Sequence, residues 1–589
     1  MEAARWFTKP AEDGNALAQV FLGCLYSQGK GVPKDEKEAV KWFMKAADQG
    51  DKGGQHNLAA CYFNGIGVPK DEKKGADLLA KVAEQGNAES QDELGQIFYA
   101  GVGVGKNEKE AFKWWKKAAE QGNANSQFNI GVCYRDGIGV AKDEGKAFEY
   151  FIKSAEAGDA EAQCALGYCY KNGIGVSTDK QKSAQWFAKS AEQGDADAQY
   201  RLGRCYQYGI GVAKDEKKAF EWFAKSAGQG DTDGQTNLGR CYQYGIGVTK
   251  DEKKAYEWFT KSAEQGDADG QYKLGRCYEV GIGVTKDEKK AFEWFSKSAE
   301  QGDADGQNNL GSCYQYGIGV TKDEKKAFEW FSKSAEQGDA DGQNNLGSCY
   351  LKGIGVTKDD KRAFEWFVKS AEQGNARGQT CLGKCYLEGM GVAKDEKEAV
   401  KWLTKAVEQG DAWGASQLGY CYGDGRGIAK DEKKAFELYT KAAEQGDAWG
   451  QGQLGYCYET GKGVAMDEKE ALKWCTKAAE QGNVFGQNAI AWILATSNDP
   501  AIRNGKEAEK WAQKVIATMG SSNANSLGAL AAAYAEQGNF AAAVSTQEKA
   551  VSMLTKQDAD KSKQFDDHLK SYQAKKPWRE LRSPEKKSN

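Results

Sequence analysis

The sequence predicts an all-α fold, a solenoid of 36-residue helix–loop–helix repeats. Three observations support this prediction. A glycine recurs every 36 residues from Gly14 to Gly482, each interval contains two segments of helical periodicity, and the apolar and aromatic positions keep the same phase from one interval to the next. Such a period is typical of units that cannot bury their apolar face alone and therefore stack on their neighbours.

The interval from Asp303 to Gly338 shows how one repeat is built. The first predicted helix has one face made of Gln307, Leu310, Gly311, Cys313 and Tyr314. The second predicted helix has a corresponding face made of Ala327, Trp330, Phe331, Ser334 and Ala335. Each repeat is therefore expected to hold two helices.

Caps and turns should delimit these helices. Asp303 and Asp323 stand where an N-cap carboxylate accepts the free amide hydrogens of a first turn. Gly317 and Gly319 lie in the six-residue loop between the helices, and Gly338 follows the second helix, where a positive φ is needed.

Packing within a repeat should combine small and aromatic residues. Gly311 and Ala327 are small enough to let the two helix axes approach closely. Trp330 recurs in phase along the chain, and we expect it to be a buried core residue. Truncation of one such buried tryptophan to alanine should then cost about 3 to 5 kcal/mol.

These residues resemble the Sel1-like repeat, a relative of the tetratricopeptide repeat, over about 480 residues. The resemblance depends on Leu310, Gly311, Cys313, Tyr314, the string Gly317 to Val320, Lys322, Asp323, Ala327, Trp330, Phe331, Ala335 and Gly338. It implies a right-handed α/α solenoid superhelix whose concave face, lined mainly by first helices, holds a partner protein or peptide. It also implies a scaffold or adaptor rather than an enzyme.

Cysteine usage favours reduced core thiols. Eleven of the fifteen cysteines share one phase: Cys61, Cys133, Cys169, Cys205, Cys241, Cys277, Cys313, Cys349, Cys385, Cys421 and Cys457. Successive equivalents should lie about 10 Å apart, beyond the roughly 7 Å limit between the Cα atoms of a disulfide. A secreted branch of the resembled family bridges its helices with cysteines at positions that hold Gln307 and Ala335 here. Reduced thiols favour a cytoplasmic location.

Composition excludes several functions. The formal net charge of −4 makes nucleic acid and anionic lipid unlikely partners, and no apolar stretch reaches the roughly 18 residues that membrane insertion needs. His56 and His568 are the only histidines, so a catalytic triad is not expected. We predict no cofactor and no metal, because potential ligands are not clustered along the chain.

The candidate binding residues lie on the first helices, at positions that the tetratricopeptide comparison places toward the groove. Where one repeat has Ser312, other repeats have Arg204, Arg240, Arg276, Lys384, Tyr420 and Tyr456. Neighbouring positions add Tyr200, Arg201, Tyr272 and Lys273. Arginines bind carboxylates and aromatic rings add apolar contact, so the partner is expected to be an acidic protein or peptide. Equally open is that nearby aspartates balance solvated cations.

A second candidate cluster combines Trp413, Trp449, Tyr420 and Tyr456 in two adjacent repeats. Solvent-facing tryptophans at matching positions are costly unless they are covered. Two interpretations remain open: a partner-contact surface, or packing against the C-terminal segment.

Four segments are expected. Residues 1–14 match the second helix of a repeat, so the natural chain could begin upstream, with a signal peptide that this sequence lacks. Thirteen repeats fill residues 15–482. Residues 483–576 form divergent tetratricopeptide-like capping helices, with Gln547 where an aromatic is usual, and residues 577–589 form a polar tail.

The sequence thus predicts a protein-interaction scaffold or adaptor that binds along its concave face. One alternative is a structural spacer or multivalent array, because several repeats are nearly identical. A hydrolytic enzyme related to the cysteine-rich branch is the weaker alternative, because no nucleophile has a base beside it.

Overall fold

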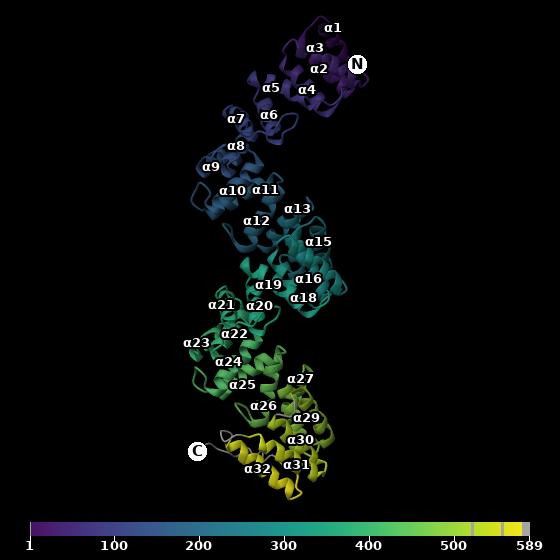
Figure 1. Cartoon of the computed structure of the whole chain (residues 1–589). Helices are drawn as coiled ribbons and strands as arrows, with labels where there is room; N and C mark the ends of the chain where they lie inside the picture. Colours follow the sequence, from purple (N-terminus) through teal and green to yellow (C-terminus); the bar gives the residue numbers. More distant parts are fainter. Residues whose placement is uncertain (1, 520–522, 555–558, 580–589) are drawn as a thin grey trace. The chain divides into compact units, whose positions relative to one another are not determined.

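Helices alone make up the regular secondary structure of the part of the chain that is described. The computed structural model describes residues 2–519, 523–554 and 559–579, and these residues form 32 α-helices and no strand. The chain divides into two units, Met1–Asp287 and Glu288–Asn589. Figure 1 shows the helices of each unit following one another in antiparallel pairs. The predicted all-α solenoid of helix pairs is confirmed.

The first unit contains sixteen helices. Their bounds are α1 Glu2–Glu12, α2 Ala16–Gln28, α3 Glu36–Asp48, α4 Lys52–Asn64, α5 Glu72–Glu84, α6 Ala88–Ala100, α7 Glu108–Glu120, α8 Ala124–Asp136, α9 Glu144–Glu156, α10 Ala160–Asn172, α11 Lys180–Glu192, α12 Ala196–Tyr208, α13 Glu216–Gly228, α14 Thr232–Tyr244, α15 Glu252–Glu264 and α16 Ala268–Val280. Even-numbered helices are the first helices of repeats, and odd-numbered helices are the second. The predicted partial repeat at residues 1–14 holds α1, which packs on α2 through stacked Phe7 and Phe21 rings.

The second unit holds the remaining helices. Their bounds are α17 Glu288–Glu300, α18 Ala304–Tyr316, α19 Glu324–Glu336, α20 Ala340–Lys352, α21 Asp360–Glu372, α22 Ala376–Glu388, α23 Glu396–Glu408, α24 Ala412–Asp424, α25 Glu432–Glu444, α26 Ala448–Thr460, α27 Glu468–Glu480, α28 Val484–Thr496, α29 Gly505–Met519, α30 Ala524–Glu536, α31 Phe540–Ser552 and α32 Ala559–Gln573. Each helix packs on the next one, and successive first helices such as α18 and α20 also touch.

The predicted caps delimit the repeat formed by α18 and α19. The Asp303 carboxylate accepts from the amide of Gly306, and Asp323 accepts from the amides of Lys325 and Lys326. Gly317 ends α18 with φ of 74° and Gly338 follows α19 with φ of 94°. Helix boundaries are therefore set by residues that lie within a few positions of them.

Gly319 is needed for a second reason besides its φ of 67°. A Cβ atom at this position would collide with the carbonyl oxygen of Glu288, in the first turn of α17 one repeat earlier. The loop of each repeat therefore rests on the start of the preceding second helix, and a side chain would push the two repeats apart.

Phe331, rather than Trp330, fills the centre of the repeat. Phe331 has no exposed surface, and a Cβ atom on Gly311 would lie only 2.7 Å from its ring, so the expected close approach of the helices at this glycine is confirmed. Trp330 is half-buried, and the Lys333 ammonium lies 3.8 Å from its ring centroid. The expectation of a buried Trp330 was therefore wrong, because the neighbouring phenylalanine faces the paired helix.

A ladder of buried glutamines joins the repeats. Gln307 is 5% exposed, its side-chain amide donates to the Ala299 carbonyl of the preceding repeat at 3.2 Å, and its oxygen accepts from Gln337 at 2.7 Å. The same amide pair recurs between Gln343 and Gln373. Gln307 thus links neighbouring helices through hydrogen bonds, at a position where the secreted branch of the resembled family is expected to carry a disulfide-bonded cysteine.

None of the fifteen cysteines, all of which lie within the described residues, forms a disulfide. The eleven in one phase are buried, and burial raises the pKa of Cys241, Cys277 and Cys349 to about 12. These thiols are therefore protonated at neutral pH and act as small core residues.

The C-terminal helices close the array differently. Gln547 is fully buried on α31, and its amide donates to the Phe565 carbonyl of α32 at 3.0 Å. Gly528 on α30 leaves room for the Phe565 ring. Trp578 and Arg579, from the segment assigned to the polar tail, contact His568 and Glu536. The rest of that predicted tail, residues 580–589, lies outside the described residues.

Candidate partner-binding surface

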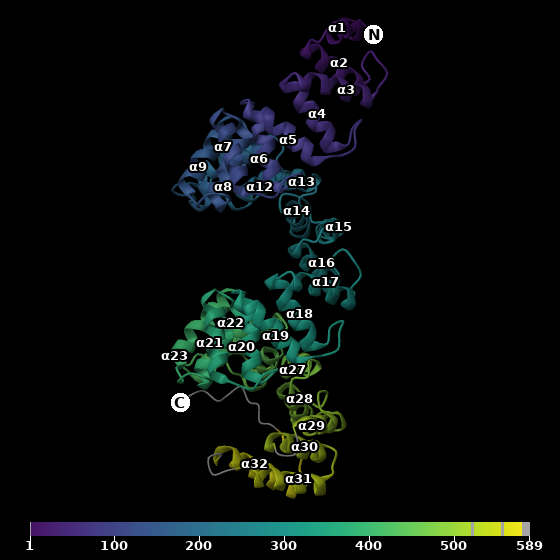
Figure 2. The ribbon, with the colours of Figure 1, turned by 45° about the horizontal axis from the view of Figure 1, so that its top comes forward.

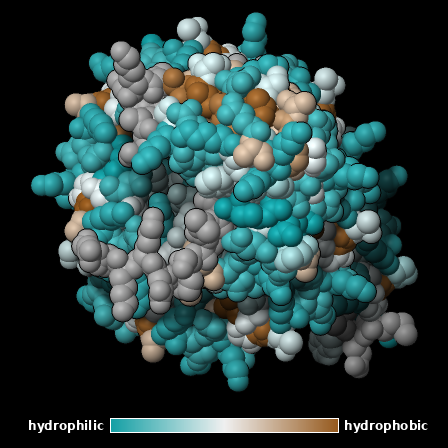
Figure 3. Space-filling view, turned by 90° about the horizontal axis from the view of Figure 1, so that it is seen from below, coloured by the Kyte–Doolittle hydropathy of each residue, from teal (hydrophilic) through white to brown (hydrophobic). Residues whose placement is uncertain are grey.

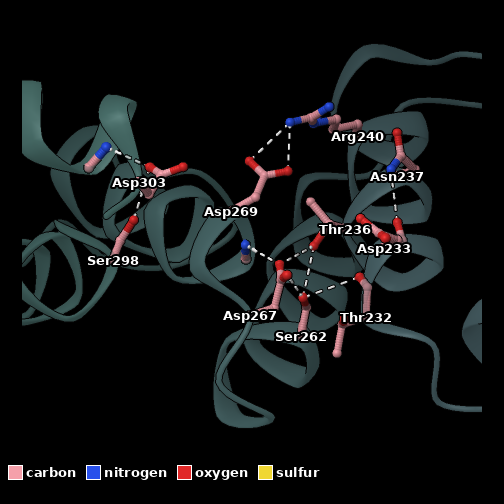
Figure 4. Close-up of polar contacts among 12 residues, drawn as sticks. Thr232, Asp233, Thr236, Asn237, Arg240, Ser262, Asp267, Asp269, Ser298 and Asp303 are labelled. Atoms are coloured by element: carbon pink, nitrogen blue, oxygen red, sulfur yellow. Dashed lines mark hydrogen bonds and ion pairs between the residues drawn. The ribbon is translucent and has the colours of Figure 1, made fainter. Parts of the chain in front are cut away.

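Arg204, Arg240 and Arg276 occupy equivalent positions on α12, α14 and α16, and each has a partner within the chain. One terminal nitrogen of Arg240 donates to both carboxylate oxygens of Asp269 at 2.8 and 3.0 Å, which joins α14 to α16 (Figure 4). Arg276 donates to Glu279 at 2.5 Å. Arg204 instead donates to the Tyr200 hydroxyl at 3.3 Å. A ligand would therefore have to displace a carboxylate from Arg240 and Arg276, but only a neutral hydroxyl from Arg204.

The neighbouring predicted residues Tyr200, Arg201 and Lys273 also contact other side chains of the protein. Arg201 donates to Asp197 at 2.8 Å, and its guanidinium lies 5.1 Å from the Tyr168 ring centroid. Tyr200 is only 9% exposed and packs on the core, so it offers little surface to a partner. Lys273 lies 4.5 Å from the ring centroid of Tyr272.

A polar network holds the backbone under these side chains. The Asp267 carboxylate caps α16 by accepting from the Gly270 amide at 2.6 Å, and it also accepts from Ser262 at 3.0 Å and Thr236 at 3.2 Å (Figure 4). One carboxylate thus ties α14, α15 and α16 together, which gives the surface a rigid base.

Carboxylates crowd the same face. Partial desolvation raises the pKa of Asp233, and the charges of Asp231 and Asp267 raise it further. An acidic ligand would meet this negative charge as well as the arginines. The arginines alone therefore do not make the face attractive to anions.

Sequence reasoning missed exposed tyrosines at the ends of the first helices. Tyr208 on α12 is 56% exposed and Tyr244 on α14 is 65% exposed, each one turn beyond the arginine of its helix, Arg204 or Arg240. The Arg204 guanidinium lies 5.4 Å from the Tyr208 ring centroid. The recurring Cys-Tyr-Gln-Tyr string was the available signal, because its second tyrosine follows the core phase by two residues. We call Arg204, Tyr208, Arg240 and Tyr244 the tyrosine–arginine surface.

The second predicted cluster packs mainly on preceding repeats. The half-buried Trp449 ring makes edge contacts with Tyr420 on α24 and Tyr439 on α25, with centroids 6.0 and 6.2 Å away. Trp413 is half-buried beside Lys384, whose ammonium lies 5.8 Å from its ring centroid. Packing of Trp449 on the preceding repeat is a third arrangement that the two sequence interpretations did not include.

Tyr456 extends this cluster toward the C-terminal helices. Its ring centroid lies 5.9 Å from that of Phe485 on α28, and Lys462 donates to its hydroxyl at 3.3 Å. Trp413 and Tyr420 lie on α24, and Trp449 lies at the start of α26, so Tyr456 near the end of α26 is the member that contacts α28.

The described surface shows mixed chemistry. In the view of Figure 3, hydrophilic residues cover most of the visible face, and hydrophobic residues form small, separate patches.

Among the described residues, no helix is long and apolar enough to cross a membrane. In the same part of the chain, no group of three or more His, Cys, Asp or Glu side chains could hold a metal ion.

The Sel1 repeat family model matches the chain thirteen times in succession. The matched residues are 16–51, 53–87, 88–123, 124–159, 160–195, 196–231, 232–267, 268–303, 304–339, 340–375, 376–411, 414–447 and 450–483. The chain belongs to the Sel1 repeat family. Sel1 repeat proteins are generally non-catalytic scaffolds for protein interactions.

Several solved structures are similar to this chain. A protective antigen of uropathogenic Escherichia coli with an SLR fold is 35% identical, with a TM-score of 0.60 over 82% of this chain and 96% of that chain. A Sel1 repeat protein of Oxalobacter formigenes is 33% identical, with a TM-score of 0.39 over 52% of this chain and 90% of that chain. Cysteine-rich protein B of Helicobacter pylori is 33% identical, with a TM-score of 0.18 over 21% of this chain and 90% of that chain. The comparison with curated proteins gives no match.

Proposed function

We propose that this Sel1 repeat protein is a scaffold that binds a partner protein or peptide along its first-helix face, with the tyrosine–arginine surface as the main contact in the first unit. One observation carries the proposal. On both α12 and α14, an arginine is followed four residues later by an exposed tyrosine. Tyrosine and arginine are the residue types enriched at energetic centres of protein interfaces.

Acidic side chains on the partner form part of the proposal. Arg204 is the arginine best suited to bind them, because its side chain donates to a neutral phenol and a carboxylate would be a stronger acceptor. Arg240 would contribute less, because an incoming carboxylate would compete with Asp269. Binding should therefore depend more on Tyr208, Tyr244 and Arg204 than on Arg240.

Affinity capture from a lysate of the source cell, followed by measurement of the dissociation constant of a captured partner, tests this function. Three forms are compared with the wild type: Tyr208→Ser with Tyr244→Ser, Arg204→Gln, and a control that carries Lys217→Glu with Lys253→Glu. The two control lysines are exposed on α13 and α15. The tyrosine variant should lose the partner, Arg204→Gln should weaken binding, and the control should retain it.

Each result has a defined meaning. Loss in the tyrosine variant alone supports a neutral rather than an acidic partner on the same surface. A partner held equally by all forms contradicts the tyrosine–arginine surface. Identical captured sets without a specific partner favour the spacer alternative, which the internal pairing of Arg201, Arg240 and Arg276 also favours.

A further inference from the structure

A cavity of about 350 Å³ lies in the second unit, where the last repeat meets the C-terminal helices. Four helices line it: α26, α28, α30 and α32. Figure 2 shows α28 to α32 following one another at the end of the chain. The volume is at the lower end of the range for ligand pockets, enough for one amino-acid residue of a ligand.

Aromatic rings form the apolar part of this cavity. Tyr456 and Phe485 contact each other on one side, with centroids 5.9 Å apart. The Trp492 and Phe565 rings both contact the His568 ring, with centroids 5.2 and 5.8 Å from it. Phe485 is 40% exposed, so an aromatic ring remains accessible from solvent.

Two residues of the lining, Asn488 and His568, carry buried polar atoms without a hydrogen-bond partner among the described residues. His568 lines the cavity and is 1% exposed, yet neither of its ring nitrogens has a hydrogen-bond partner among the described residues. The side-chain oxygen of Asn488, also in the lining, is buried without a partner in the same part of the structure. Such groups are costly unless a ligand or water satisfies them.

The charge of the lining favours an uncharged ligand. Among the described lining residues, the charged groups are one carboxylate, Glu459, and one ammonium, Lys561, which balance each other. Burial lowers the pKa of His568 to about 4, so its imidazole is neutral at pH 7 and offers one donor and one acceptor. Asn488 offers an additional acceptor. A peptide group, with one N–H and one C=O, matches these needs.

We propose that this cavity binds one uncharged apolar residue of a partner peptide, with the side chain among Tyr456, Phe485, Trp492 and Phe565 and the adjoining peptide groups hydrogen-bonded to Asn488 and His568. The inference rests on the proposed function only in taking a peptide as the ligand. It assigns to the second unit a specificity pocket that is separate from the tyrosine–arginine surface of the first unit.

Histidine NMR on the full chain tests the pocket, because His56 and His568 are the only histidines. His56 lies on α4 in the first unit and serves as an internal reference. The probes are N-acetyl-L-leucinamide, N-acetylglycinamide, which lacks the apolar side chain, and N-acetyl-L-glutamic acid α-amide, which carries a charge. In a chain labelled with ¹⁵N-histidine, the leucine probe should shift the ring signals of His568 saturably and leave those of His56 unchanged.

Two variants sharpen the result. Phe485→Ser removes a partly exposed ring without opening the core, and Asn488→Leu removes the acceptor; each should weaken binding of the leucine probe at least about fivefold. Tyr208→Ser is the matched control on another surface and should leave binding unchanged. Unchanged His56 signals show that each variant is folded in the first unit, and retention of the helical circular dichroism signal covers the rest.

The proposal is overturned if His568 does not respond to the leucine probe, if the glycine or glutamate probe produces the same shift, or if both variants bind as well as the wild type. These outcomes are independent of the capture experiment, because the probes need no natural partner. A pocket that binds the leucine probe in a chain that captures no protein would contradict the scaffold function and leave the pocket standing.

Discussion

The central repeat and the C-terminal helices satisfy their buried polar groups in different ways. In the repeat, the Gln307 amide donates to the preceding repeat and its oxygen accepts from Gln337. At the C-terminus, His568 is also buried, but neither of its ring nitrogens has a hydrogen-bond partner among the described residues, and Gln547 occupies a position where an aromatic is usual. A repeated unit receives the same partners from each neighbour, whereas a terminal unit has no following copy and can depart from the pattern to form a specific site.

The largest expected effect separates the two aromatic residues of the repeat. Phe331→Ala should lower the free energy of unfolding by about 3 to 5 kcal/mol, because it empties a fully buried position beside Gly311. Trp330→Ala should cost less, because that ring is only half-buried. Urea denaturation followed by circular dichroism measures both. An equal or larger loss for Trp330→Ala would contradict the assignment of Phe331 as the core residue.

Acid should destabilise the C-terminal helices more than the repeats. Folding lowers the pKa of His568 from 6.5 to about 4, chiefly through burial, so between these pH values the unfolded chain binds a proton that the folded chain does not. The free energy of unfolding of this region should therefore fall by about 3 kcal/mol as the pH decreases from 7 to 4. Hydrogen exchange of α32 against pH measures the effect.

His568→Phe is the matched control for this pH dependence. It keeps an aromatic ring in contact with Trp492 and Phe565 but has no group to protonate, so the local acid sensitivity of α32 should largely disappear. If α32 in this variant still opens in acid as readily as in the wild type, His568 is not the group responsible.

Removing a glutamine should have a smaller effect, and a different one in each region. Gln307→Leu should lower the free energy of unfolding by about 1 to 3 kcal/mol, because the Ala299 carbonyl and the Gln337 amide lose their partner. Gln547→Leu should instead destabilise the packing of α32 alone, because the Phe565 carbonyl of that helix accepts a hydrogen bond from the Gln547 side chain. Hydrogen exchange by mass spectrometry distinguishes the two. Faster exchange confined to α32 in the Gln307 variant would refute this difference.

The smallest effect is expected at the surface. The Arg240–Asp269 pair is about one-third exposed on both sides, so a double-mutant cycle with Arg240→Ala and Asp269→Ala should give a coupling energy of less than about 1 kcal/mol at physiological salt. A larger coupling energy would mean that the pair holds α14 and α16 together rather than merely neutralising charge.

Local features of the fold could be predicted from the sequence because their causes are local. Asp303 and Asp323 cap helices through amides two or three residues away, and Gly317 ends a helix through its own φ. The period and phase of the repeats then establish that neighbouring copies stack. The first-helix positions of Arg204 and Arg240 followed from the same phase.

The partners of these side chains could not be predicted in the same way. The pairing of Arg240 with Asp269 depends on the offset between α14 and α16, and the contact between Trp449 and Tyr439 depends on how one repeat rests on another. Periodicity identifies a helical face but does not distinguish Phe331 from its neighbour Trp330 as the residue that meets Gly311. The exposed Tyr208 and Tyr244 carried a signal in the sequence, but only their exposure made them candidates.

By itself, the sequence therefore determined the helix pairs, their caps, their number and the Sel1 repeat family, because these depend on spacing and on interactions within a few residues. Only the tertiary structure decided which ring enters the core, which side chain meets each arginine, and that the ring nitrogens of His568 have no hydrogen-bond partner among the described residues of the cavity that α26, α28, α30 and α32 line. Those outcomes depend on distances between residues far apart in the chain, which arise only when the helices pack.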